Sequence, residues 1–149
     1  MQKLGIGNYK LSKKAKALYT KTVLGGETVE FIKPQTFMNK SGYSVSYAKN
    51  KHKIFVDNIY VVYDDLDLRL GTYKIQKGKG PKNHKGLNSI YENLGEKDFW
   101  HIRIGVENRE GSGISGEDYV LANFKKDEMF ILQNTLDQVI KELSKHVGV

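Results

Sequence analysis

Residues 59–67 have the sequence IYVVYDDLD, and this stretch decides the fold class. Its first five residues form an unbroken run of β-branched and aromatic side chains, which predicts a strand covered on both faces, as in a parallel sheet. Asp64 is the first polar residue after that run. Sites of open α/β sheets lie at the carboxyl ends of strands. Asp64 is therefore a candidate to orient a histidine or to hold a cation, and the alternative is a polar turn that only closes the strand.

Helices and strands alternate on either side of this stretch. A hairpin is predicted from residues 19–23 and 28–32 around Gly25 and Gly26, a strand from 71–75, a helix from 87–94 that ends at Gly95, a strand from 100–106 with one apolar face, and an amphipathic helix from 132–143. Residues 38–50 fit either a strand or a helix. Strands interleaved with helices predict an α/β layered domain, and 149 residues suit a single one.

The composition excludes several classes of protein. There is no cysteine, which rules out a disulfide framework, a thiol nucleophile and any cysteine-ligated metal site. No apolar run approaches the roughly 20 residues of a membrane span, and the first residues do not have the apolar core of a signal peptide. The sequence therefore predicts a cytoplasmic protein without a membrane anchor.

The net charge of +7 is unevenly distributed along the chain. Residues 1–55 carry a net charge of +9, residues 56–85 carry +2, and residues 86–149 carry −4. A basic first half is typical of a surface that binds RNA or DNA, although a solvated lysine-rich face is an equal alternative. Because 21 of the 24 cations are lysines, contacts with the phosphate backbone are expected more than readout of bases.

Two further stretches have chemistry of their own. Residues 74–86 (KIQKGKGPKNHKG) contain five Lys, three Gly and no acid, a composition that suits a phosphate; a loop without any ligand is the alternative. Residues 33–42 read KPQTFMNKSG. Within them Phe37 and Met38 could simply belong to the core and Asn39 could be a helix N-cap. A histidine such as His84, taken alone, is more often a surface residue than a catalytic one.

Taken together, five motifs resemble the bacterial-type peptidyl-tRNA hydrolases. They are KPQTFMNKSG (33–42), VVYDDLDL (61–68), NHKGL (83–87), IRIGV (102–106) and DYVLANF (118–124). The resemblance covers roughly residues 10 to 143. It implies a monomeric α/β/α fold with a mixed sheet, hydrolysis of the ester between a peptide and tRNA, and no metal or other cofactor. In that family a histidine acts as general base on water, and an aspartate holds the histidine in its useful tautomer.

The resemblance also assigns roles to individual residues. Asp64 corresponds to the orienting aspartate, Asn39 to the asparagine that positions water or substrate, and His84 to a second histidine on the substrate side. These three are the predicted catalytic residues. Residues predicted to contact substrate or tRNA are Phe37, Met38, Asn39, Lys77, Lys79, Lys85 and Arg103, of which Arg103 is expected to hold a phosphate.

Some features of the family pattern differ here. The first apolar strand, its Gly-x-Gly-Asn-Pro-Gly turn and the Thr-Arg-His-Asn segment that carries the base histidine have no counterpart, and none of the four histidines lies in such a setting. The expectation is a single domain over residues 1–149, shortened at its amino end, with the first strand missing and catalysis impaired. A non-catalytic RNA-binding relative is the alternative. Lys85, Asn83 and Gln76 also replace the asparagine, glycine and lysine that the family favours.

Overall fold

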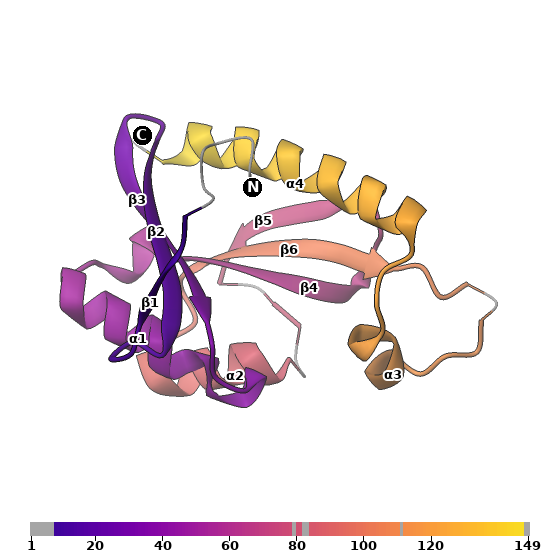
Figure 1. Ribbon diagram of the computed structural model, residues 1–149, viewed down its shortest axis with the longest axis horizontal. Helices are drawn as coiled ribbons and strands as arrows, with labels where there is room; N and C mark the ends of the chain where they lie inside the picture. Colours follow the sequence, from indigo (N-terminus) through magenta and orange to yellow (C-terminus); the bar gives the residue numbers. More distant parts are fainter. Residues whose placement is uncertain (1–7, 79, 82–83, 111, 148–149) are drawn as a thin grey trace.

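The computed structural model describes residues 8–147 except 79, 82, 83 and 111, and it leaves the side chains of residues 39, 120 and 121 undescribed. Its central sheet consists of β4 (Tyr60–Arg69), β6 (Trp100–Glu107) and β5 (Tyr73–Lys77), in that order (Figure 1). β4 and β6 are parallel, and β5 is antiparallel to β6. The regular pairing of β4 with β6 ends at Asp65, where the register shifts. Asp64 therefore lies at the carboxyl end of the paired segment.

Helices cover both faces of this sheet. α4 (Lys126–His146) packs on the face that bears Ile102 and Ile104, while α2 (Lys85–Leu94) packs on the opposite face against Tyr63 and Phe99. α1 (Ser41–His52) lies beside α2 (Figure 1). A short helix, α3 (Gly116–Leu121), follows β6. The expected α/β/α layering around a mixed sheet is confirmed.

A second, antiparallel sheet consists of β1 (Lys10–Ser12), β2 (Ala17–Leu24) and β3 (Glu27–Pro34). The predicted hairpin is confirmed as β2 and β3, with Gly25 and Gly26 in its turn at positive φ. A side chain at Gly25 would collide with carbonyl oxygens near the end of α4. At the other end of the hairpin, the Ser44 hydroxyl of α1 donates to the carbonyl of Ala15 over 2.7 Å. The second sheet thus contacts both helical layers.

Residues 38–50, which fit a strand or a helix by sequence, form the 3₁₀ helix η2 (Met38–Lys40) and most of α1. The face of α1 turned inward carries Gly42, Ser44 and Ala48, all buried. At Gly42 an added Cβ would collide with the carbonyl oxygen of Ser89 in α2. The helices approach closely because these side chains are small, and small side chains give no hydrophobic periodicity in the sequence.

Two predictions about strand faces are wrong. The 59–63 run is not covered on both faces, because Val62 is 51% exposed. The polar side of residues 100–106 is not a solvent face, since His101 is fully buried and Gly105 is buried as well. Both differences follow from the strand order: β6 is the central strand of the three and is covered on both faces, while β4 has one pairing partner among the strands described.

Candidate active site

Asp64 and His84 lie side by side although they are 20 residues apart in the chain. The Nε2 atom of His84 is 3.4 Å from Oδ1 of Asp64. The hydrogen bond from His84 holds the pKa of the Asp64 carboxyl below its usual value, against an opposing effect of burial. Asp64 is therefore ionised at neutral pH and accepts the proton that His84 presents.

The tautomer of His84 follows from its other contact. His84 is the N-cap of α2, and the backbone N–H of Leu87 donates to its Nδ1 over 3.2 Å. An Nδ1 atom that accepts a hydrogen bond carries a lone pair, so the neutral imidazole has its proton on Nε2, facing Asp64. Asp64 and the first turn of α2 together fix one tautomer of His84.

Apolar side chains adjoin this pair. At Gly86 an added Cβ would lie 2.7 Å from the Met38 sulfur and 3.1 Å from Cε1 of His84, so only a glycine lets these two groups approach each other. Met38 is exposed, and Phe37, the residue before η2, is 81% exposed. The backbone of Asn39 lies in η2, but its side chain lies outside the description. Its predicted contact with water or substrate stays a prediction.

Arg103 is held in an ion pair that the sequence did not reveal. Its Nε donates to Oδ2 of Asp65 over 2.6 Å, and its Nη1 donates to Oε1 of Gln76 over 3.1 Å. The side chains of Arg103 and Asp65 are only 14% and 1% exposed. The arrangement fixes the guanidinium between neighbouring strands, and its predicted role toward a phosphate stays a prediction.

The predicted lysines have separate locations. Lys85 is the exposed first residue of α2, directly after His84. Lys77 ends β5, and its ammonium lies 2.5 Å from Oδ1 of Asp57, a contact that raises the Lys77 pKa. Lys79 lies outside the described residues. Of these lysines, the structure places Lys85 beside the Asp64–His84 pair.

The sequence analysis missed Tyr63 and His101. The Tyr63 hydroxyl is 2.9 Å from Nδ1 of His101, and the Tyr63 ring meets the His84 ring edge-on with centroids 5.1 Å apart. Burial lowers the His101 pKa, so this imidazole is neutral at pH 7. The available signal was the two-residue alternation along both strands, which places Tyr63 and His101 on the face that α2 covers.

The remaining histidines have other partners. His52 pairs with Glu30 over 3.1 Å, and His146 packs edge-on against Trp100. His84 is thus the histidine that the described contacts join to Asp64. In the part of the chain that the structure describes, no group of three His, Cys, Asp or Glu side chains could hold a metal ion. Nor does any described helix have the length and apolar character needed to cross a membrane.

A cavity of about 830 Å³ lies apart from this pair, on the α4 side of the sheet. It is lined by Tyr60, Tyr73, Trp100, the end of α4 and the residues before β4. The hydroxyl of Tyr73 donates to Glu142 over 2.5 Å there. We place the candidate active site at Asp64 and His84, and not in this cavity, because a carboxylate and an imidazole meet there where the regular pairing of β4 with β6 ends.

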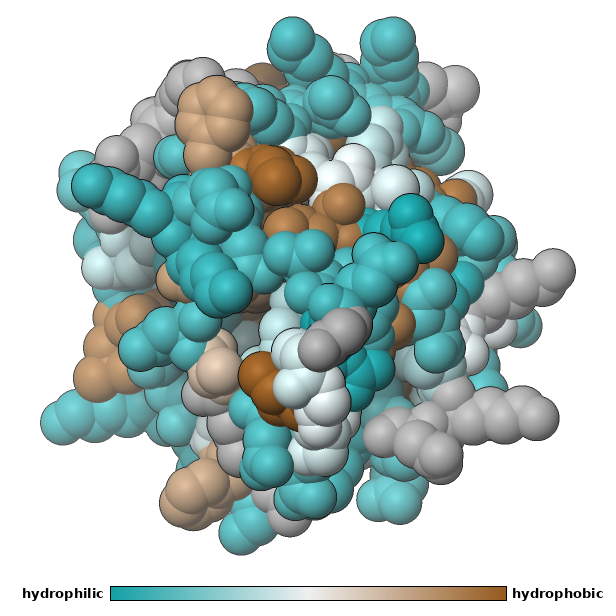
Figure 2. Space-filling view, turned by 90° about the vertical axis from the view of Figure 1, so that its right-hand side faces the viewer, coloured by the Kyte–Doolittle hydropathy of each residue, from teal (hydrophilic) through white to brown (hydrophobic). Residues whose placement is uncertain are grey.

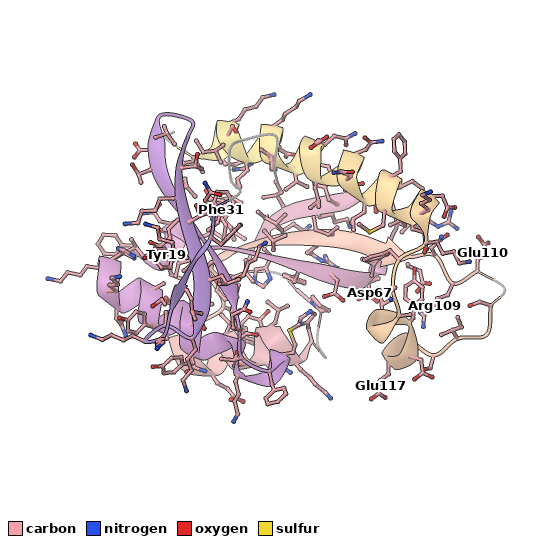
Figure 3. All side chains as sticks on the ribbon, viewed as in Figure 1. Tyr19, Phe31, Asp67, Arg109, Glu110 and Glu117 are labelled. Carbon is pink, nitrogen blue, oxygen red and sulfur yellow. The ribbon has the colours of Figure 1, made fainter. Side chains whose placement is uncertain are left out.

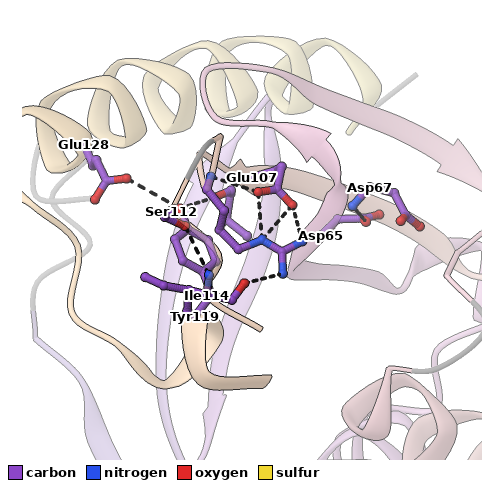
Figure 4. A network of polar contacts seen from close by, with 9 residues as sticks. Asp65, Asp67, Glu107, Ser112, Ile114, Tyr119 and Glu128 are labelled. Carbon is purple, nitrogen blue, oxygen red and sulfur yellow. Dashed lines mark hydrogen bonds and ion pairs between the residues drawn. The ribbon is translucent and has the colours of Figure 1, made fainter. Parts of the chain in front are cut away.

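The segment after β6 is anchored beyond the end of β4 (Figure 3 and Figure 4). The guanidinium of Arg109 donates to both carboxylate oxygens of Glu107, and its Nη1 donates to the carbonyl of Ile114 over 3.4 Å. Tyr119 of α3 donates to the carbonyl of Val106 over 2.6 Å. Figure 2 shows the face at this end as mostly hydrophilic, with hydrophobic side chains in small separate groups. A ligand on this face would meet mainly polar groups.

Comparison with known proteins connects this geometry to one family. The family model described as peptidyl-tRNA hydrolase matches residues 2–148. The peptidyl-tRNA hydrolase of Desulfitobacterium hafniense is 39% identical over 131 residues, which cover 88% of this chain and 70% of that protein. The peptidyl-tRNA hydrolase of Geobacter metallireducens is 39% identical over 144 residues, 95% of this chain and 72% of that protein.

Solved structures give the same result. The crystal structure of peptidyl-tRNA hydrolase from Acinetobacter baumannii superposes with a TM-score of 0.82 at 26% identity, over 94% of this chain and 70% of that chain. A peptidyl-tRNA hydrolase crystallised with N-propanol superposes with a TM-score of 0.84, also at 26% identity, over 96% of this chain and 71% of that chain. The chain therefore belongs to the peptidyl-tRNA hydrolase family.

Proposed function

We propose that this protein hydrolyses the ester bond between a peptide and tRNA, with the Asp64–His84 pair as its reactive centre. The observation that carries the proposal is the 3.4 Å contact between Nε2 of His84 and Oδ1 of Asp64 in a member of this family. An ionised carboxylate that holds one imidazole nitrogen leaves the other nitrogen with a lone pair. This is the arrangement that activation of water requires.

In this proposal Nδ1 of His84 takes the proton from water as the water attacks the ester carbonyl. His84, a substrate-side histidine by the family resemblance, thus serves as the base that the Thr-Arg-His-Asn segment supplies in that family. In the resting protein Nδ1 accepts the N–H of Leu87 over 3.2 Å, so that hydrogen bond opens when the base acts. Asp64 keeps Nε2–H in place throughout and stabilises the imidazolium that forms. The side chains of Phe37 and Met38 line the position of the scissile bond, and Asn39 is assigned the contact with water or substrate that the family resemblance implies.

The tRNA strand lies along the basic groups that follow β5 in the chain. Lys85 continues from His84, and we propose that Lys77, Lys79 and Arg103 contact phosphates with it. Lysine contacts with phosphate make binding fall with salt and contribute little base specificity. The net charge of +7 supports the proposed contact of this surface with an anionic RNA strand. We further propose that the protein works as a monomer in the cytoplasm.

The test is hydrolysis of N-acetyl-aminoacyl-tRNA by the wild-type chain and by Asp64→Asn. Asparagine removes the negative charge that fixes the His84 tautomer and stabilises the imidazolium, and kcat should fall by about 10²–10⁴. Asp67→Asn is the matched control, because Asp67 is an exposed carboxylate three residues further along the same strand. Its kcat should stay within about twofold of wild type.

Equal turnover by wild type and Asp64→Asn would remove the pair from the mechanism. A wild-type chain that binds tRNA in a salt-dependent manner without releasing the aminoacyl group would refute the hydrolase proposal. That second result would instead assign the chain to the non-catalytic RNA-binding alternative.

A further inference from the structure

Beneath the Asp64–His84 pair lies a buried hydrogen bond that the proposed mechanism does not use. It joins the Tyr63 hydroxyl to Nδ1 of His101 over 2.9 Å, with both side chains buried. We infer that Tyr63 and His101 are positioning residues, which support the backbone at Gly80 and hold the His84 ring against Asp64. This inference rests on the proposed function only for its kinetic test.

The direction of this hydrogen bond follows from the contacts of His101. Its Nε2 faces the carbonyl oxygen of Lys97 at 3.4 Å, and a carbonyl can only accept. His101 is neutral because burial lowers its pKa, so its proton is on Nε2 and Nδ1 carries a lone pair. The Tyr63 hydroxyl therefore donates to Nδ1, and each polar atom of the pair has a partner.

The pair contacts the loop through Gly80. A Cβ added at Gly80 would lie 2.7 Å from the Tyr63 oxygen and 2.9 Å from Nδ1 of His101. The backbone at Gly80 therefore lies directly against the hydrogen-bonded atoms, and no larger residue fits there without a shift. Four residues later the same loop supplies His84.

The pair contacts His84 through the ring of Tyr63. The two rings meet edge-on, with centroids 5.1 Å apart and planes at 64°. Aromatic pairs favour this geometry. On its other side, the His101 ring stacks on Phe99 with centroids 4.5 Å apart, which fixes the imidazole. Rigid packing thus extends from Phe99 through His101 and Tyr63 to the His84 ring.

Three variants test the inference. Tyr63→Phe keeps the ring but removes the donor, and kcat should fall about tenfold with KM changed less than about twofold, because a small misplacement of a catalytic group affects the chemical step most. Gly80→Ala should lower kcat in the wild-type background. In the Tyr63→Phe background the same substitution should cost less, since the nearer of the two polar atoms that the methyl group meets is gone while Nδ1 of His101 remains. Tyr73→Phe, which removes a tyrosine hydroxyl bonded to Glu142, is the matched control and should leave kcat unchanged.

A second readout does not depend on activity. In ¹⁵N NMR spectra of the imidazoles, wild-type His84 should show one tautomer with its proton on Nε2, and Tyr63→Phe should show a mixture of tautomers. Wild-type kcat and an unchanged His84 spectrum in Tyr63→Phe would overturn the inference and leave the pair as ordinary core. Should the wild-type chain release no aminoacyl group, the proposed function fails and the His84 spectrum alone decides the inference.

Discussion

The side chain of His84 makes two contacts that two substitutions can separate. Its Nδ1 caps α2 by accepting the N–H of Leu87, and its Nε2 faces Asp64. His84→Ala removes both contacts. Asparagine is among the best N-cap residues and is shorter than histidine, so His84→Asn keeps an acceptor for Leu87 while the imidazole is lost.

The magnitudes follow from the surroundings of each contact. Loss of an N-cap lowers the free energy of unfolding by about 1 kcal/mol. The contact with Asp64 is 3.4 Å long at a carboxylate that is 44% exposed, so solvent screening leaves it worth well under about 1 kcal/mol. His84→Ala should therefore lower the melting temperature by about 2–4 °C. His84→Asn should stay close to wild type in stability, and both variants should lose kcat.

Urea and thermal denaturation followed by circular dichroism measure the stabilities, and release of N-acetyl-aminoacyl groups from tRNA measures kcat. Equal destabilisation by Asn and Ala would show that the Leu87 contact is not what His84 contributes to stability. The argument for one fixed tautomer would then fail. Undiminished turnover by His84→Asn would refute His84 as the base, whatever the stability data show.

Three further predictions concern other parts of the structure. Gly42→Ala should lower the free energy of unfolding by about 1–3 kcal/mol in urea denaturation, because the α2 backbone blocks the added methyl group. Asn50→Ala, on the exposed side of the same helix, should change it little. Equal effects of the two substitutions would contradict the close helix contact. The lowered His101 pKa means that the unfolded chain binds more protons below pH 6.5. The free energy of unfolding should therefore drop as pH falls from 6.5 through the folded-state pKa of His101. His101→Gln should flatten this pH dependence. An identical pH profile in the variant would exclude His101 as the source of the dependence. Asp65→Ala leaves the buried guanidinium of Arg103 without its carboxylate partner. The variant should lower the free energy of unfolding by about 3 kcal/mol in urea denaturation. Asp67→Ala serves as the control, and a comparable loss there would argue against a special role for the buried pair.

The elements predicted from sequence were those with strong hydrophobic periodicity. The apolar spacing in residues 132–143 is confirmed as part of α4, and the run at residues 59–63 is confirmed as part of β4 from Tyr60 onward. The prediction was ambiguous for α1, whose inward face of Gly42, Ser44 and Ala48 has no apolar signature. The prediction that residues 100–106 have only one buried face was wrong. Alternation along one strand does not tell which strand is central in the sheet and therefore covered on both faces.

For the candidate site, the motifs singled out Asp64, His84 and Arg103 but not the residues that hold them. Tyr63 and Asp65 lie within the motif at residues 61–68 but had no role assigned to them, and His101 lies just before the motif at residues 102–106. Asp65 lies 38 residues from Arg103 in the chain, and Tyr63 lies 38 residues from His101. Each of these contacts exists because β4 and β6 pair in one register.

The sequence by itself determined the α/β class, the basic first half and the family, since these depend on composition, local periodicity and the order of short motifs. Only the tertiary structure decided that His84 meets Asp64, that its Nδ1 caps α2, and that the Tyr63–His101 hydrogen bond lies beneath the loop. The physical reason is that hydrogen-bond direction, tautomer and burial depend on atoms brought together from distant parts of the chain. A linear pattern of residues does not specify those distances.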